Sequence, residues 1–361
     1  MSPRQLRFIL TVVAAVTTAV ITLHFTYHGK NGLIGFPSSW SRSPQHDAPG
    51  TGAAMTVDWS RFAYVQYVTD SQYLCNSVML FEILNRLGSK ADRLMMFPAS
   101  MAANGLSDGD SEDVRLLNMA RERYNVRLHP IEVQHKSGSD PTWADSFTKL
   151  LAFNQTQYDR VLSLDSDSTL LQPVDELFLL PPCPVAMPRA YWLYPDARLL
   201  SSQVLLVQPS AREFERVMAE VDRAKDNHYD MDIVNTLYKD HASVLPHRPY
   251  DMLTGEFRRE NHSQYLGSDR ELWEPVAALN EAKFLHFSDW PVPKPWIQMS
   301  EELRTAHQPN CRQVDGAEHA FAFRRGTERY ARTRDDINAE AAGSVFEDDA
   351  ASEHCYEEQD V

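Results

Sequence analysis

Between Arg61 and Leu164 the chain alternates short apolar runs with stretches in which apolar residues recur every three or four positions. The short runs predict buried strands, and the three-to-four-residue spacing predicts helices that pack on them. Gly88 is expected to end the first long helix, and Pro98 the second strand. The predicted strands are residues 61–70, 92–98, 126–133 and 158–164, and the predicted helices are residues 71–89, 111–124 and 143–153.

Strands that alternate with helices indicate an α/β fold, in which ligands bind outside the carboxyl ends of the strands. Asp165 and Asp167 follow directly after the apolar run 161–164. Two unpaired carboxylates repel each other and resist burial, so such a pair requires a cation or a proton. Residues two apart on an extended segment face the same side and can therefore bind one hard cation, Mn²⁺ or Mg²⁺.

The spacing of two acids one residue apart is weak evidence by itself, because this chain has a formal net charge of −15. What distinguishes Asp165 and Asp167 is their position after a buried strand. The same spacing recurs at five other pairs, most of them expected to lie on the solvated surface, namely Asp108/Asp110, Glu213/Glu215, Glu220/Asp222, Asp230/Asp232 and Asp269/Glu271.

Residues 8–27 carry no Asp, Glu, Lys or Arg, and about twenty apolar residues are long enough to cross a bilayer. Arg4 and Arg7 precede them, which predicts a cytosolic tail (1–7), an uncleaved anchor (8–27) and a lumenal body. A cleaved signal peptide is the alternative, but the apolar stretch is longer than such peptides usually have.

The remaining composition limits the partners. The acidic balance argues against a nucleic acid, whose phosphates would be repelled. Residues 28–57, rich in Gly, Pro and Ser, predict an extended stem, and residues 335–361, with ten acids and no Lys or Arg, predict a solvated tail. Cys75, Cys183, Cys311 and Cys355 lie on the predicted lumenal side without a spacing that indicates their pairing, and Asn154 and Asn261 begin glycosylation sequons.

Four segments, in order, make the chain resemble the glycogenin-like family 8 glycosyltransferases, and among them the fungal Golgi N-acetylglucosaminyltransferases. The resemblance spans about 64–296. Its segments are "YVTDSQYLCNSVMLFEILNRLGS", "FTKLLAFNQTQYDRVLSLDSDSTLLQPVDELF", "SSQVLLVQPS" with "DMDIVNTLY", and "KFLHFSDWPVPKPW". It implies a GT-A-type fold, with a Rossmann-like mixed central sheet flanked by helices, and a UDP-sugar as donor.

The resemblance also implies which residues bind the donor and its metal ion. Asp165, Asp167 and His286 would bind Mn²⁺ or Mg²⁺, although a lone His in an apolar strand is more often a core residue. Lys294 would contact the diphosphate, and Trp290 and Trp296 are expected to pack a proline-rich turn. The other implied donor contacts are Val68, Thr69, Asp70, Tyr73, Lys149, Ser166, Ser201, Ser202 and Gln203.

The implied reaction transfers a sugar with retention of anomeric configuration. A bound divalent ion and Lys294 would stabilise the leaving diphosphate, while Asp230 would hold sugar hydroxyls or the acceptor. Asp232 is either a second sugar contact or a carboxylate at the start of a helix. Met231, where many relatives have Gln, cannot act as a nucleophile and favours same-face displacement.

Two further departures concern the donor site. "SSQ" (201–203) replaces Asn-Ser-Gly, so Gln203 adds bulk and an amide where the family has space. This favours a donor other than UDP-glucose, and we expect UDP-N-acetylglucosamine. Lys294 lies eight positions after His286, two more than in glycogenins, and Asp289 replaces a glycine.

We therefore expect a single-pass Golgi enzyme with a GT-A domain at 58–305, whose nucleotide-binding half is 58–180 and acceptor-side half 181–305, followed by an extension at 306–361. Its acceptor would be a glycan or a glycoprotein.

One alternative is a haloacid-dehalogenase-like phosphatase with Asp165 as nucleophile and Asp167 as acid/base. The other is a catalytically silent, membrane-anchored scaffold.

Overall fold

The computed structural model describes residues 56–103, 105–106, 111–136 and 144–307, and those from Asp58 onward belong to one compact unit. The predicted anchor, most of the predicted stem and the acidic tail lie outside these residues, as do Cys311 and Cys355. Within the described part of the chain, no helix is both long enough and apolar enough to cross a bilayer.

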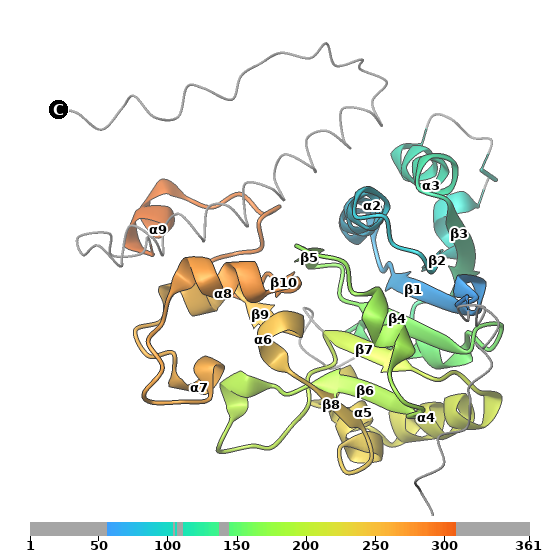
Figure 1. The fold of residues 1–361 in the computed structure, drawn as a ribbon. Helices are drawn as coiled ribbons and strands as arrows, with labels where there is room; N and C mark the ends of the chain where they lie inside the picture. Colours follow the sequence, from blue (N-terminus) through green and yellow to red (C-terminus); the bar gives the residue numbers. More distant parts are fainter. Residues whose placement is uncertain (1–55, 104, 107–110, 137–143, 308–361) are drawn as a thin grey trace, which may run out of the picture. The chain divides into compact units, whose positions relative to one another are not determined.

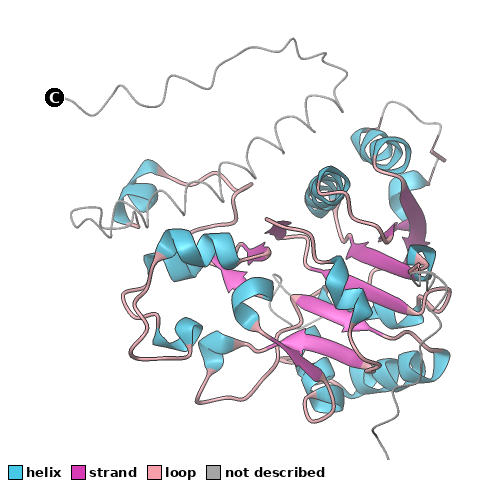
Figure 2. Ribbon diagram, viewed as in Figure 1, coloured by secondary structure: helices cyan, strands magenta, loops and turns pink. Residues whose placement is uncertain are grey.

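A seven-stranded mixed sheet forms the centre of the fold, with strand order β3-β2-β1-β4-β7-β6-β8 (Figures 1 and 2). Strands β1 to β4 run parallel, β7 is antiparallel to both β4 and β6, and β8 is parallel to β6. The strands are β1 (Phe62–Tyr67), β2 (Asp92–Pro98), β3 (Val126–Ile131), β4 (Arg160–Leu164), β6 (Val185–Pro188), β7 (Val204–Val207) and β8 (Ser243–Leu245).

A three-stranded sheet, β5-β10-β9, lies beside the main sheet (Figure 1). It consists of β5 (Ser168–Leu170), β9 (Met252–Leu253) and β10 (Phe284–His286), and β10 is antiparallel to β5 and parallel to β9. Since β5 begins three residues after Asp165, this sheet joins the end of β4 to a segment more than a hundred residues further along the chain.

Both faces of the main sheet are covered, which explains why its inner strands β1, β4 and β7 are mostly apolar. On β1, Tyr64 faces a core shared with helices α2 and α3, whereas Ala63 and Val65 face a core shared with η3, α4 and α5. The helices are α2 (Ser71–Arg86), α3 (Glu112–Arg123), α4 (Ala211–Arg223), α5 (Asp230–Tyr238) and the 3₁₀-helix η3 (Ser146–Asn154).

Shorter helices complete the described chain and serve mainly as connections. They are η1 (Trp59–Arg61), η2 (Ala99–Ala102), η4 (Asp175–Leu179), η5 (Tyr191–Leu193), α6 (His247–Tyr250), η6 (Thr254–Arg258), α7 (Ser263–Leu266), α8 (Pro275–Glu281) and α9 (Glu301–Ala306). A third core, which includes Met252, Phe257 and Leu285, packs several of them against the small sheet.

All seven predicted strands and helices between Arg61 and Leu164 form, with small shifts at their ends. Helix α2 begins after Asp70, whose side chain accepts hydrogen bonds from the backbone N–H groups of Gln72 and Tyr73 at 2.9 and 3.0 Å. It ends at Arg86, and Gly88 follows with a φ of 69°, which glycine adopts without strain.

Helix η3 is wound more tightly than an α-helix, and this places its side chains in rows three residues apart. One row, Phe147, Leu150 and Phe153, is buried in the second core. A neighbouring row contains Ser146 and Lys149, which are both buried and both contact Asp230. The three-residue period thus fixes the helix in the core and turns a lysine towards the carboxylates described below.

The order of the strands reverses between β1 and β4, because the chain runs outward from β1 through β2 to β3 and then returns to the other side of β1. Such a switch point leaves a crevice outside the carboxyl ends of the two strands, where α/β proteins bind ligands. Asp165 and Asp167 follow β4 at this point, and Val68 to Tyr73 follow β1.

Candidate active site

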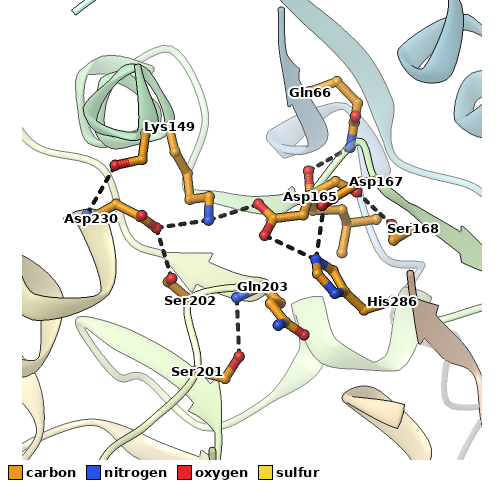
Figure 3. Close-up of polar contacts among 12 residues, drawn as sticks. Gln66, Lys149, Asp165, Asp167, Ser168, Ser201, Ser202, Gln203, Asp230 and His286 are labelled. Atoms are coloured by element: carbon orange, nitrogen blue, oxygen red, sulfur yellow. Dashed lines mark hydrogen bonds and ion pairs between the residues drawn. The ribbon is translucent and has the colours of Figure 1, made fainter. Parts of the chain in front are cut away.

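Asp165, Asp167 and His286 form a cluster that could hold a metal ion, with one ligand atom from each lying within 4.8 Å of the others. His286 Nε2 lies 3.0 Å from Asp167 Oδ1 and 3.6 Å from Asp165 Oδ2 (Figure 3). The small sheet makes this meeting possible, because His286 on β10 pairs with Ser168 on β5. The three residues that the resemblance implies as metal ligands therefore lie together.

The chemistry of this cluster fits a hard divalent cation. Two carboxylate oxygens and one imidazole nitrogen are ligands suited to Mn²⁺, and oxygen ligands also suit Mg²⁺. Although burial opposes ionisation, His286 and Lys294 hold the pKa of Asp167 far below its usual range. Asp167 in turn raises the pKa of His286, against the effect of burial. The cluster thus already has the carboxylate charge that a cation requires.

Lys149 joins this cluster to helix α5. Its Nζ lies 2.7 Å from Asp165 Oδ1 and 2.7 Å from Asp230 Oδ2, and the lysine is 2% exposed. Burial alone would lower the pKa of Lys149, but the two carboxylates raise it above its usual value, so the side chain stays charged. Ser202 Oγ also donates to Asp230 Oδ2 at 2.7 Å, which fixes that carboxylate from the β7 side (Figure 3).

The residues after β1 close one side of the crevice. Val68 is buried in the first core and its backbone N–H donates to Met96 O, whereas Thr69 is half-buried and Asp70 is exposed. Burial raises the pKa of Tyr73, and the carboxylates of Asp167, Asp70 and Asp165 raise it further, so its phenol lies within electrostatic reach of the acidic cluster. This loop and the segment of Asp165 and Asp167 were both predicted to contact the donor, and the fold brings them to one place.

The predicted sugar-side residues lie beneath the acidic pair. Ser201 and Ser202 are buried, and the Gln203 carbonyl accepts a hydrogen bond from Asp165 N at 3.0 Å. Ser166, between the two aspartates, is 3% exposed. Asp232 acts as a carboxylate at the start of a helix, because its Oδ2 accepts a hydrogen bond from Tyr229 N at the start of α5. The second role considered for it, a sugar contact, stays a prediction.

Lys294 reaches the cluster in spite of the longer connection from His286. Its Nζ donates to Asp167 Oδ2 at 2.7 Å and to the Phe287 carbonyl. Trp296 packs against the first core and meets the Tyr73 ring edge-on at 6.0 Å between centroids. Trp290 was expected to pack a proline-rich turn, and this is wrong, since the residue is 92% exposed. The segment around it is held instead by backbone hydrogen bonds and by Asp289.

Sequence reasoning did not find three polar residues that support the site. Gln66 Nε2 donates to the Leu164 carbonyl at 2.6 Å, just before Asp165, and Ser146 Oγ accepts from Asp230 N at 3.3 Å. Asp251, directly before β9, is fully buried and has His286, Asp165 and Lys149 among its charged neighbours. Gln66 could have been predicted from the sequence, because it is a polar residue inside an apolar strand. No local sequence pattern predicts the burial of Asp251, whose neighbours come from three other segments.

Asp251 predicts a dependence of stability on pH. Burial raises its pKa to about 8, so the folded protein favours the protonated carboxyl. Between about pH 4, where an unfolded aspartate ionises, and pH 8, the folded chain holds a proton that the unfolded chain has lost. Relative to Asp251→Asn, the wild-type free energy of unfolding should therefore fall by about 1.4 kcal/mol for each pH unit in this window.

Urea unfolding at pH 5, 6, 7 and 8 would measure this fall. Asp240→Asn, at an exposed position, is the matched control and should show a constant difference from wild type. A constant difference for Asp251→Asn as well would contradict the prediction.

Comparisons with known proteins indicate the fold class and the family of this chain. Among solved structures, the chain resembles the galactosyltransferase LgtC in complex with donor and acceptor sugar analogs, with a TM-score of 0.51 and 13% identity, over 76% of this chain and 95% of that one. It resembles an active-site mutant of LgtC with a TM-score of 0.50 and 14% identity, over 80% of this chain and 98% of that one. At such identities the likeness concerns the fold alone.

Curated relatives are much closer in sequence. Glucose N-acetyltransferase 1 of Gibberella zeae is 64% identical over 258 residues, which are 71% of this chain and 57% of that protein. Glucose N-acetyltransferase 1 of Aspergillus fumigatus is 48% identical over 268 residues, 71% of this chain and 70% of that protein. This chain thus spans little more than half the length of the first of these relatives. No protein-family model matches the chain.

The fold, a mixed central sheet with an acidic site at its switch point, is of the GT-A-like kind that the LgtC structures show. The chain belongs to the family of fungal proteins named glucose N-acetyltransferase 1. The expected resemblance to family 8 glycosyltransferases is confirmed. The alternative prediction, a haloacid-dehalogenase-like phosphatase, is wrong.

Proposed function

We propose that this protein is a metal-dependent, retaining glycosyltransferase that moves N-acetylglucosamine from UDP-N-acetylglucosamine to a glycan or a glycoprotein. The observation that carries the proposal is the cluster of Asp165, Asp167 and His286 at the carboxyl end of β4. The family name, which refers to glucose and an N-acetyl group, supports this sugar. Gln203, beside the acidic pair, supports a donor site that differs from that of glucose-transferring relatives.

In the proposed mechanism, Asp165, Asp167 and His286 would hold Mn²⁺ or Mg²⁺, which would supply Lewis acidity for the leaving diphosphate. Lys294, beside Asp167, brings a second positive charge to that diphosphate. Val68, Thr69, Asp70 and Tyr73 bind the nucleoside on the β1 side of the crevice, and Ser166 approaches the ribose through its backbone.

On the sugar side, Asp230 orients hydroxyl groups of the donor sugar or of the acceptor. Lys149 and Ser202 hold its carboxylate in place, so the same lysine fixes both a metal ligand and a sugar contact. With Met231 beside it, the protein offers no nucleophile at this position, and the acceptor hydroxyl attacks from the face that the diphosphate leaves. The product keeps the anomeric configuration of the donor.

We also propose a Golgi location with a single N-terminal anchor and a lumenal catalytic domain. The support is the apolar segment 8–27 with Arg4 and Arg7 before it. An epitope placed at either end of the chain, tested for protease protection in intact vesicles, distinguishes this orientation from the reverse.

Turnover with a panel of donors tests the reaction. The full chain, purified in detergent, is mixed with Mn²⁺, glycans released from secretory glycoproteins, and UDP-N-acetylglucosamine, UDP-glucose or UDP-galactose. We expect UDP release with UDP-N-acetylglucosamine, its loss on chelation and recovery with added Mn²⁺, and an α-linked product by NMR. Release with another donor alone would contradict the sugar, and neither turnover nor UDP binding with any donor would favour the scaffold alternative.

A further inference from the structure

The segment from Phe287 to Trp296 connects the candidate metal ligand His286 with Lys294. It contains no helix or strand, and Trp290 near its middle is 92% exposed. Lys294 nevertheless holds a defined place, with Nζ 2.7 Å from Asp167 Oδ2. A flexible side chain on such a connection needs an anchor if its charge is to stay at one point in the site.

Arg258, at the end of η6, provides one anchor. Its Nε lies 2.9 and 2.8 Å from the two carboxylate oxygens of Asp289, and its Nη2 donates to the Asp289 backbone oxygen at 3.0 Å as well as to Oδ1. The two side chains are 14% and 7% exposed, so water screens the pair only weakly. A planar guanidinium that binds carboxylate and backbone of one residue fixes both the position and the direction of the segment.

Gly255, at the other end of η6, provides a second anchor. Its backbone N–H donates to the Ser288 carbonyl at 3.0 Å. A Cβ atom at position 255 would lie 2.9 Å from that oxygen and 3.1 Å from Asp289 Oδ1, closer than side-chain carbons normally approach. The glycine therefore lets η6 lie directly against Ser288 and Asp289.

Helix η6 is itself held in place, because it follows β9 directly and β9 pairs with β10, the strand that ends in His286. The two anchors thus tie the beginning of the connection to the sheet that carries the histidine. Asp289 offers Arg258 a carboxylate within this connection, two residues after Phe287.

We propose that Arg258, Asp289 and Gly255 form a clamp that positions Lys294 against the diphosphate of the donor. The three act through the lysine and touch no substrate, so they are positioning residues. This inference rests on the proposed function for the role of Lys294. The competing explanation is that the same contacts merely stabilise the fold.

A double-mutant cycle with Lys294 separates the two explanations. We expect Asp289→Asn to lower kcat/KM for the preferred donor by about 30-fold, since a misplacement of about 1 Å can cost up to 100-fold, and Lys294→Ala to lower it further. In the full chain carrying both changes, kcat/KM should equal that of Lys294→Ala alone within about twofold, because the clamp then has no lysine to position. Effects that multiply would overturn the proposal.

Gly255→Ala provides a perturbation that removes no charge. It should lower kcat/KM in the wild-type background but not in the Lys294→Ala background, as Asp289→Asn does. Arg248→Met is the matched control, because Arg248 also makes ion pairs, with Glu271 and Glu281, in the same part of the fold. It should leave kcat/KM within about twofold of wild type. An effect of Arg248→Met as large as that of Asp289→Asn would favour the merely structural explanation.

A readout without turnover keeps this test independent of the proposed function. The rate at which an amine-reactive reagent labels Lys294, followed by mass spectrometry on the full chain, should rise at least about threefold in Asp289→Asn and Gly255→Ala but not in Arg248→Met. Unchanged labelling in both clamp variants would overturn the clamp even if the wild type is active. If the wild type shows no turnover while labelling rises as expected, the proposed function fails and the clamp remains.

Discussion

Asp167→Asn is expected to weaken Mn²⁺ binding by about 100-fold or more and to lower kcat/KM by about 10³-fold. The substitution keeps the size of the side chain but removes the charge that faces both His286 and Lys294, at 3.0 and 2.7 Å. It therefore removes one of three candidate metal ligands and takes from His286 and Lys294 the carboxylate nearest to each. Titration calorimetry with Mn²⁺ and steady-state kinetics measure the two effects.

The matched control is Asp222→Asn, on the exposed face of α4. Asp222 belongs to Glu220/Asp222, a pair with the same spacing as Asp165 and Asp167, but it lies far from any apolar strand end in the sequence. Its substitution should leave both Mn²⁺ binding and kcat/KM unchanged within about twofold, as is usual for exposed sites. If Asp167→Asn binds Mn²⁺ as tightly as the control does, the metal site is not where we place it.

Lys149→Met is expected to lower the free energy of unfolding by about 3–5 kcal/mol. Its Nζ lies 2.7 Å from both Asp165 and Asp230, which are 8% and 7% exposed. Methionine has a similar length but no charge, so two buried carboxylates would lose the cation between them. Denaturation with urea, followed by tryptophan fluorescence, measures the change.

The origin of this loss can be tested by neutralising one of the carboxylates first. In the Asp230→Asn background, Lys149→Met should cost clearly less, because only Asp165 is left without its partner. Lys239→Met, at an exposed position, should stay within about 0.5 kcal/mol of wild type. An equal cost of Lys149→Met in both backgrounds would show that packing of the lysine chain, rather than its charge, determines stability here.

Local patterns were sufficient for the elements before Leu164 and for the acidic pair. A buried apolar run followed by two carboxylates indicated a strand end at a ligand site, and β4 ends at Leu164, directly before Asp165. Gly88 and Asp70 mark the two ends of α2, since one adopts a positive φ and the other accepts hydrogen bonds from the first turn. These features depend on neighbours within a few residues, so they can be predicted from sequence.

Local sequence patterns did not predict which residues surround Asp165 and Asp167. Trp290 was expected to pack a turn and is almost fully exposed, whereas Asp251, which no pattern singled out, is fully buried beside the site. Lys149 resembled a donor contact, but its bridge between Asp165 and Asp230 depends on a 3₁₀-helix that its sequence did not distinguish from an α-helix. Each of these outcomes depends on segments that are far apart along the chain.

The sequence by itself determined the alternation of strands and helices, the acidic pair after a buried strand, and, through resemblance, the histidine and lysine that belong with it. Only the tertiary structure decided how they meet. Pairing of β10 with β5 brings His286 to Asp167, and the contacts of η6 with Ser288 and Asp289 hold the segment that carries Lys294. The physical reason is that propensity, capping and periodicity act within a few residues, whereas strand pairing, burial and the screening of charge depend on which distant segments exclude water together.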